Sequence, residues 1–143
     1  MKVRQISIFL ENRSGRLAGV LSEVAKAGVN IRALSLADTS DFGILRLIVD
    51  DVDACVKALK DSGHTVSLTE VLAVEVPDRP GGLAGILEAL SKADLNVEYM
   101  YAFVCRATEK AVVVFRFEDA NAAIAALGDA GISILPAETV YAL

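Results

Sequence analysis

The sequence predicts an α+β protein that contains two tandem copies of one small unit. Three observations predict it: a long internal repeat, a repeated order of strand and helix patterns, and the absence of a Gly/Ser/Pro linker between the copies. Residues 12–31 and 78–97 align without a gap at an offset of 66 positions and share nine identical residues. A repeat of this length indicates two domains of one fold, which we place at residues 1–70 and 71–143.

The first copy has the order strand, helix, strand, strand, helix, strand. Alternating apolar residues predict the strands, and apolar residues at three- and four-residue spacing predict the helices. The predicted strands are Val3–Leu10, Asn30–Ala37, Gly43–Val49 and Thr65–Leu68, and the predicted helices contain Leu17–Val24 and Val52–Leu59. Gly28 and Gly63 follow these helices, as expected for helix ends, and Asp50 or Asp51 can cap the second helix.

The second copy repeats this order, with a connection between its middle strands that is two residues longer. Its predicted strands include Leu72–Val76, Val97–Val104 and Ala111–Phe117, and its helices contain Leu83–Leu90 and Ala120–Leu127. A last segment, Thr139–Leu143, aligns with Val71–Glu75 and predicts a further strand at a sheet edge. This order gives, in each copy, a four-stranded antiparallel sheet with two helices on one face.

The other face of each predicted sheet is unusually apolar. The residues expected there are Phe9, Leu34, Leu36, Ile44 and Ile48 in the first copy, and Met100, Ala102, Val112 and Val114 in the second. A solvated sheet face is polar at alternate positions, so we expect another sheet to cover these faces. Units of roughly 70 residues also gain from shared burial, so the sequence predicts an oligomer.

Composition excludes several kinds of partner. The net charge is −5 and the basic residues form no stripe, which argues against nucleic acid and anionic membranes. No apolar run approaches the roughly 18 residues of a membrane span, and we see no signal peptide. The two cysteines occupy non-equivalent places in the repeats. These features predict a cytoplasmic protein without disulfides.

Residues suited to catalysis are scarce. The single histidine, His64, follows a helix, and Cys55 and Cys105 have no histidine to activate them. No Cys/His cluster predicts zinc, and the aspartates between Asp38 and Asp53 are typical of turns and caps, with a weak cation site as the less favoured alternative. We therefore predict no enzyme activity, no catalytic or metal-ligating residue and no cofactor.

The turn before the first helix of each copy is the strongest candidate for binding. Asn12 and Asp78 are side-chain acceptors there, and Gly15 and Gly81 let the backbone approach a ligand closely. Free N–H groups of the first helical turn form an arrangement that suits a carboxylate. Asn30, like its repeat partner, begins the next strand and is expected near the same end. The spacing equally allows a capped turn that binds nothing.

These turns resemble those of the ACT domain family. The resemblance rests on Asn12-Arg-Ser-Gly15-Arg-Leu-Ala and Asp78-Arg-Pro-Gly81-Gly-Leu-Ala, each followed by a helix and an Asn-Ile or Asn-Val pair, and it covers essentially the whole chain. It implies a ferredoxin-like fold, βαββαβ in each copy, and amino-acid binding at interfaces between ACT units. The plan is similar to that of stand-alone tandem ACT proteins, which carry no attached enzyme.

The resemblance implies a set of ligand-binding residues in both turns and at the start of both following strands. They are Asn12, Arg13, Ser14, Gly15, Arg16, Leu17, Asn30 and Ile31 in the first copy, and Asp78, Arg79, Pro80, Gly81, Gly82, Leu83, Asn96 and Val97 in the second. Ser14 replaces a common proline. Leu10 and Val76 stand where serine-sensing members carry histidine, which argues against serine as the ligand.

The sequence thus predicts a non-catalytic, homodimeric protein that binds an amino acid and controls amino-acid metabolism. One alternative is a regulatory subunit of a biosynthetic enzyme such as acetolactate synthase, acting mainly through protein contact. A small enzyme on a ferredoxin-like scaffold is the other, and the scarcity of histidine argues against it.

Overall fold

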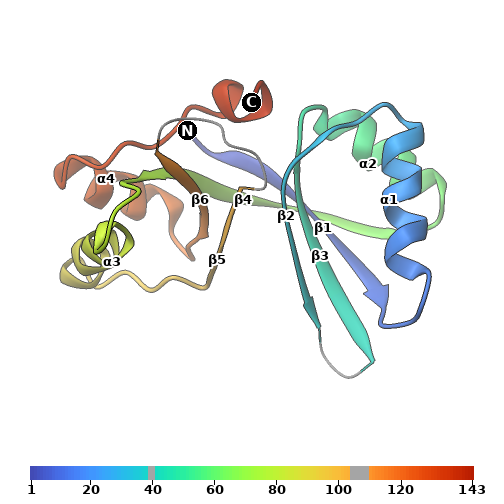
Figure 1. Ribbon diagram of the computed structural model, residues 1–143, viewed down its shortest axis with the longest axis horizontal. Helices are drawn as coiled ribbons and strands as arrows, with labels where there is room; N and C mark the ends of the chain where they lie inside the picture. The colour runs from blue at the N-terminus through green and yellow to red at the C-terminus, as the bar shows by residue number, and fades with distance from the viewer. Residues whose placement is uncertain (39–40, 104–109) are drawn as a thin grey trace. The chain divides into compact units, whose positions relative to one another are not determined.

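The computed structural model describes residues 1–38, 41–103 and 110–143 of the chain. It divides into two compact units (Figure 1). The first unit is Arg4–Thr69, and the second unit is Met1–Val3 together with Glu70–Leu143. Each unit is α+β, with antiparallel strands and helices, as the tandem ferredoxin-like prediction requires.

The first unit is a sheet with the strand order β2-β3-β1-β4, and helices α1 and α2 lie on the same side of it (Figure 1). The elements are β1 (Val3–Glu11), α1 (Arg16–Lys26), β2 (Ile31–Asp38), β3 (Phe42–Val49), α2 (Val52–Asp61) and the first part of β4 (Thr65–Val76). In β1, Ile6 pairs with Leu47 and Ile8 pairs with Leu45 of β3. These four side chains are fully buried, so the predicted apolar face of β1 does form the core.

Helix α2 begins with the side-chain cap that the sequence predicts. The carboxylate of Asp51 accepts the N–H of Ala54 at 3.1 Å, and Asp50 instead accepts the N–H of Asn30 at 2.9 Å. The repeat preserves the cap, because Asp119 accepts the N–H of Ala122 at 3.0 Å at the start of α4. Of the two candidates, Asp51 is therefore the cap, and Asp50 ties the loop before β2 to the end of β3.

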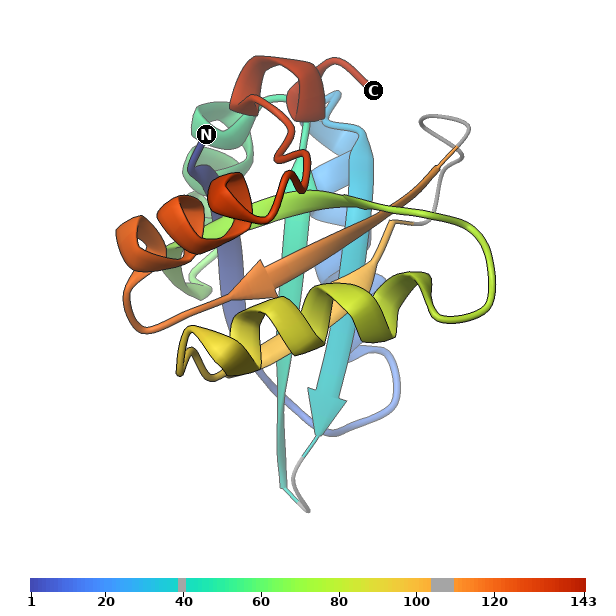
Figure 2. The ribbon, with the colours of Figure 1, turned by 90° about the vertical axis from the view of Figure 1, so that its left-hand side faces the viewer.

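The second unit is a sheet with the order β4-β6-β5, and α3 and α4 lie side by side across it (Figure 2). Its elements are the second part of β4, α3 (Gly82–Lys92), β5 (Tyr99–Ala102), β6 (Ala111–Arg116), α4 (Ala120–Asp129) and α5 (Ala137–Tyr141). One apolar cluster joins β4, α3, β6 and α4, and it includes Leu72, Val74, Ile86, Leu90, Phe115, Phe117 and Leu127. The rings of Phe115 and Phe117 stack at 5.9 Å.

Two predicted strands are one strand in the structure. The sequence predicts Thr65–Leu68 as the last strand of one copy and Leu72–Val76 as the first strand of the next, with no linker between them, and β4 runs unbroken from Thr65 to Val76. The residues between them, Thr69–Val71, include no glycine or proline that would end a strand, and β-branched residues favour continued pairing. Strand β5 is shorter than the predicted Val97–Val104, whose last residue lies outside the described ranges.

The end of the second unit differs most from the prediction. The segment Ser133–Leu135 pairs with β4 through an isolated bridge of Ile134 with Val74, flanked by hydrogen bonds of 3.0 and 2.8 Å. Pro136 then ends the pairing and precedes the helix α5. The prediction of an edge strand at Thr139–Leu143 is therefore wrong. A proline with its φ fixed, followed by Ala137 and Glu138, favours a helix start.

The apolar outer faces are partly exposed. Phe9 is 52% exposed, Leu36 48% and Met100 40%, whereas Ile48, Val112 and Val114 are buried. The expectation that another sheet covers these faces stays a prediction. Among the described residues, no helix has the length and apolar character that a membrane crossing needs.

Candidate functional site

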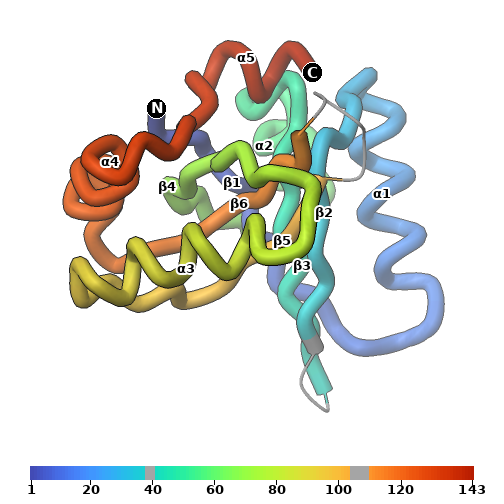
Figure 3. The backbone as a smooth tube through the Cα atoms, turned by 60° about the vertical axis from the view of Figure 1, so that its left-hand side comes forward, coloured from blue at the N-terminus to red at the C-terminus, as the bar shows by residue number. Residues whose placement is uncertain are grey.

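The two turns that precede α1 and α3 have the same backbone geometry. In the first, the N–H of Arg13 donates to the carbonyl of Glu11 at 2.9 Å, and the N–H of Arg16 donates to the carbonyl of Arg13 at 3.2 Å. In the second, Arg79 donates to Pro77 at 2.9 Å and Gly82 donates to Arg79 at 3.0 Å. The repeat in sequence is thus a repeat in hydrogen bonding (Figure 3 follows β4 through this bend into α3).

A glycine in the left-handed region stands at the N-cap of each helix. Gly15 has a φ of 86° and Gly81 a φ of 83°, and neither helix has a side-chain cap. Asn12 and Asp78, the side-chain acceptors predicted in these turns, are therefore not at the N-cap position, because the chain places glycine there. Most other residues are strained at such φ values. The motif needs glycine for the turn itself.

Because the N-cap glycines have no side chain to accept a hydrogen bond, both helices begin with N–H groups that have neither a side-chain cap nor an intrahelical acceptor. Gly19 donates to Gly15 and Gly85 donates to Gly81, both at 2.9 Å, so the helical ladder begins there. The N–H groups at the second and third helical positions precede that ladder and have no intrahelical acceptor. They belong to Leu17 and Ala18 in α1 and to Leu83 and Ala84 in α3. Such groups attract an anion such as a carboxylate.

A cleft of about 360 Å³ lies beside the second turn, within the second unit. We call it the second-unit cleft. The end of β4, the turn, helix α3, the residue before β6 and the segment after α4 line it. Its lining includes Glu75, Pro77, Arg79, Gly81, Gly82, Gly85, Ile86, Ala89, Lys110, Ala130, Gly131, Ile132 and Ser133. Three of these side chains carry charge, and the wall between them is mostly apolar.

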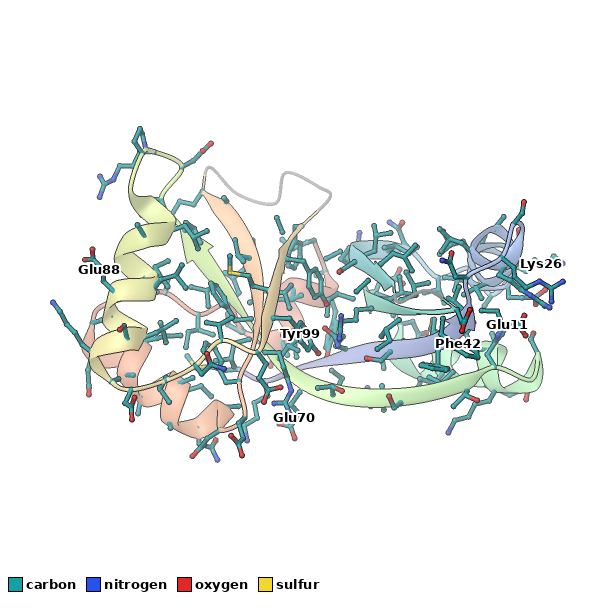
Figure 4. All side chains as sticks on the ribbon, turned by 90° about the horizontal axis from the view of Figure 1, so that it is seen from below. Glu11, Lys26, Phe42, Glu70, Glu88 and Tyr99 are labelled. Atoms are coloured by element: carbon teal, nitrogen blue, oxygen red, sulfur yellow. The ribbon has the colours of Figure 1, made fainter. Side chains whose placement is uncertain are left out.

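A smaller cleft of about 220 Å³ lies at the matching place within the first unit. We call it the first-unit cleft, and it is lined by Phe9, Leu10, Glu11, Arg16, Val20, Phe42, Gly63, His64 and Thr65. Here Glu11 forms ion pairs with Arg13 at 3.0 Å and with Arg16 at 3.8 Å. Glu11 and Phe42 are direct partners across β1 and β3 and lie together in Figure 4.

The structure brings only part of the predicted site together. Of the residues predicted in the turns, Arg79, Gly81 and Gly82 line the second-unit cleft, and Arg16 lines the first-unit cleft. The remaining polar positions of the turns are exposed: Asn12, Arg13, Ser14, Asp78 and Pro80. Leu83 instead packs against the core of the second unit, and Leu17 is half-buried.

Asn30 and Asn96 do not lie near the turn of their own unit. Each follows the far end of an 11-residue helix, which separates the two ends by about 16 Å. Asn96 and Val97 border a different hollow, with Leu87 and Asp94. The backbone of Asn30 pairs with Asp50 in both directions, at 2.9 and 3.1 Å, and Ile31 begins β2. The expectation that these asparagines share one end with the turns is wrong within a unit.

The sequence reasoning missed Glu75, Lys110 and the segment Ala130–Ser133 of the second-unit cleft. A signal was available, because the repeat aligns Glu75 with Phe9 and Lys110 with Phe42. Two aromatic residues replaced by two opposite charges mark a divergent surface between otherwise similar copies.

Cys55, one of the candidate catalytic groups, sits in unreactive surroundings. The side chain of Cys55 is fully buried. Burial, followed by the nearby Asp50 and Asp51 carboxylates, raises the pKa of its thiol from 9.0 to about 11. The thiolate that a nucleophile needs is therefore suppressed. His64 donates its backbone N–H to Leu59 at 3.0 Å at the end of α2, and Cys105 lies outside the described residues.

Metal-ligating side chains do not gather in the described part of the chain. Among residues 1–38, 41–103 and 110–143, no three His, Cys, Asp or Glu side chains come together as a metal site. The acidic residues near Asp50 act in the cap of α2 and in the loop before β2, as described above.

Comparison with known proteins gives a family and a fold. The family model of the ACT domain pair matches residues 1–139. The crystal structure of protein BT0572 from Bacteroides thetaiotaomicron is 42% identical, with a TM-score of 0.93 over 100% of this chain and 98% of that one. A search of curated proteins found no match.

Two more distant structures share the fold. The ligand-free regulatory subunit of aspartate kinase from Thermus thermophilus is 18% identical, with a TM-score of 0.64 over 89% of this chain and 91% of that one. The regulatory subunit of aspartate kinase from Thermus flavus is also 18% identical, with a TM-score of 0.61 over 90% and 92%.

Proposed function

Because the chain belongs to the family of ACT domain pairs, we propose that it is a non-catalytic regulatory protein that binds an amino acid. The observation that carries this proposal is the repeated turn. Each turn places a glycine at positive φ directly before a helix and leaves helical N–H groups for a carboxylate. The buried, suppressed thiol of Cys55 supports a role without catalysis.

The protein would act by conformational coupling rather than by chemistry. A ligand that binds one arrangement of ACT units more tightly than another shifts the balance between them. Couplings of this kind are typically 1–3 kcal/mol, which changes affinity for a second partner by about 5- to 150-fold. We propose that this coupling lets the protein control an enzyme of amino-acid metabolism in the cytoplasm.

We propose a homodimer as the assembly. Phe9 and Phe42 stack with ring centroids 5.0 Å apart while remaining 52% and 42% exposed. Exposed stacked rings are favourable contact points for a second copy of the chain. Asn30 and Asn96, distant from the turn of their own unit, could join a ligand site only from a neighbouring unit, such as one of that second copy.

A thermal-shift screen of the full chain against the twenty standard amino acids tests the proposal. A ligand present at 100 times its dissociation constant stabilises the folded protein by about 2.7 kcal/mol, so at least one amino acid should raise the melting temperature clearly. If none of the twenty amino acids raises it, the proposed function is wrong.

Calorimetry on turn variants connects the binding to the proposed site. Gly81→Val places a branched side chain at the helix start and should abolish binding there. Gly28→Val is the matched control, because Gly28 also has a positive φ, 73°, but lies at the other end of α1. It should cost similar stability and leave binding intact. Equal loss of binding in both variants would mean that backbone strain, not the turn, is responsible.

The same exposed rings favour a second candidate, a regulatory subunit that binds a biosynthetic enzyme such as acetolactate synthase through protein contact. Co-purification with a large catalytic chain at equal yield with and without amino acids would favour this candidate. Co-purification that appears or disappears with one amino acid would favour the sensor.

A further inference from the structure

The two clefts occupy equivalent positions but differ in the charges that line them. The repeat aligns their linings position by position, with an offset of 66 before the longer connection and 68 after it. The pairs are Phe9 with Glu75, Glu11 with Pro77, Arg16 with Gly82, Val20 with Ile86, Phe42 with Lys110 and His64 with Ile132. Phe9, Glu11, Arg16 and Phe42 each differ in charge from their counterparts, whereas Val20 and Ile86 are both apolar.

The first difference removes a carboxylate partner from an arginine. In the first unit, Arg13 pairs with Glu11 at 3.0 Å. In the second unit, Pro77 stands in place of Glu11, so Arg79 lacks the carboxylate that its counterpart has. Within the described residues, Arg79 forms no ion pair. Its guanidinium lines the second-unit cleft without an ion pair to any carboxylate of residues 1–38, 41–103 and 110–143.

The second difference opens space. Arg16 borders the first-unit cleft and reaches Glu11 at 3.8 Å. Its counterpart Gly82 has no side chain, and the carbonyl of Pro77 occupies the place that a Cβ would need. The cleft volumes follow this change, with about 360 Å³ in the second unit and about 220 Å³ in the first.

The third difference replaces an apolar contact with two opposite charges. Phe9 pairs with Ile44 and Glu11 with Phe42, so the stacked rings of Phe9 and Phe42 are diagonal neighbours. In the second unit, Glu75 pairs with Val112 and Val76 with Ala111. The same register places Glu75 diagonal to Lys110. Both residues line the second-unit cleft.

We propose that the second-unit cleft binds one zwitterionic aliphatic α-amino acid and that the first-unit cleft binds none. Arg79 and Lys110 hold the ligand carboxylate, and Glu75 holds its ammonium group. Pro77, Ile86, Ala89 and Ile132 provide an apolar wall for the side chain. In the first unit the arginines already have a carboxylate, so the chain binds one ligand. This inference rests on the proposed function and specifies its site.

The first test measures stoichiometry and ligand chemistry by calorimetry on the full chain. Alanine, valine, leucine and isoleucine are the probes, and the tightest binder is compared with its amide and its deaminated acid. We expect one ligand per chain and about tenfold or greater loss of affinity for each derivative, because each lacks one charged group. Two ligands per chain, equal binding of the deaminated acid, or binding of polar amino acids alone would overturn the inference.

The second test uses single variants with matched controls. Glu75→Gln and Arg79→Gln should each weaken binding about tenfold or more, because each removes a hydrogen bond to a charged ligand group. Glu88→Gln, on the exposed side of α3, and Lys92→Gln, at its far end, should leave affinity unchanged. Circular dichroism and melting curves establish that all four variants are folded.

The third test introduces into the second unit the ion pair that Arg13 and Glu11 form in the first unit. Pro77→Glu gives Arg79 the carboxylate that Arg13 has, and the backbone tolerates it because Glu11 accepts the same N–H bond in the first turn. Affinity should fall by about tenfold. If an amino acid binds the wild type but Pro77→Glu, Glu75→Gln and Arg79→Gln bind it unchanged, this inference is wrong and the proposed function stands. If no amino acid binds the wild type, both are wrong.

Discussion

The carbonyl oxygen of Pro77 occupies the space that a side chain at Gly82 would need. Gly82 is buried at the first position of α3, whereas Arg16, at the same position of α1, extends outward to Glu11. The two turns share their backbone hydrogen bonds, yet the first turn has room for the side chain of Arg16. The close approach is therefore specific to the second turn. It explains how one copy accepts an arginine where the other requires glycine.

Gly82→Ala should therefore destabilise the second unit. The methyl group has no space beside Pro77, and overpacking of this kind costs about 1–3 kcal/mol. Gly128→Ala is the control, because Gly128 lies in α4 with nothing within 4 Å of an added Cβ. It should stabilise by about 0.5–1 kcal/mol through helix propensity. Urea denaturation of both variants checks the contrast, and a Gly82→Ala protein as stable as the wild type would contradict it.

The caps of α2 and α4 should contribute similar stability. Asp51→Ala and Asp119→Ala each remove a side-chain hydrogen bond to a helical N–H and should cost about 1 kcal/mol. Asp129→Ala, at the last position of α4, is a matched control. It removes a carboxylate from the negative end of the helix dipole and should be neutral or slightly stabilising. Denaturant midpoints that do not separate Asp119→Ala from Asp129→Ala would show that the cap is unimportant.

The thiol of Cys55 should make stability depend on alkaline pH. Its pKa rises from 9.0 to about 11 in the folded protein, chiefly through burial. The unfolded chain therefore loses its thiol proton first, and the contribution to stability is complete below pH 9 and falls as the pH rises toward 11. The comparison is between Cys105→Ser and the double variant Cys55→Ala/Cys105→Ser, by denaturation at pH 8 and pH 10.

Only the protein that retains Cys55 should show the additional loss of stability. The same Cys105→Ser protein should react slowly with a thiol reagent at pH 8 until it is unfolded. Rapid reaction in the native state would mean that Cys55 is accessible.

The exposed ring pair should take part in assembly. Light scattering of the wild type should give a mass above the 15.1 kDa of one chain at micromolar concentration. Phe9→Ser/Phe42→Ser should weaken the assembly, because it removes two stacked, exposed rings from the surface. Lys57→Ser, on an exposed face of α2, should not. A wild-type protein that remains a monomer would rule out the homodimer.

Local sequence patterns were sufficient to predict features that depend on contacts between residues close in the sequence. Asp51 was predicted as a possible cap, and the glycines at the turns were predicted to matter, because capping and φ preference depend on neighbouring residues. The same patterns did not locate the helix start, because Asn12 is the acceptor that they place in the turn and the structure has Gly15 at the N-cap. A shift of a few residues in the helix start is beyond what periodicity resolves.

By itself, the sequence determined that this protein has two copies of one unit, with a glycine turn and a helix in each, because the repeat and its spacing are local. Only the tertiary structure decided that Ala137–Tyr141 is a helix rather than an edge strand, and that Asn96 follows the end of α3 opposite the turn of its own unit. It also decided that Glu75 and Lys110 take the places of Phe9 and Phe42 beside a cleft. The physical reason is that strand register and helix direction bring together residues that are distant in the chain, and no local pattern encodes those contacts.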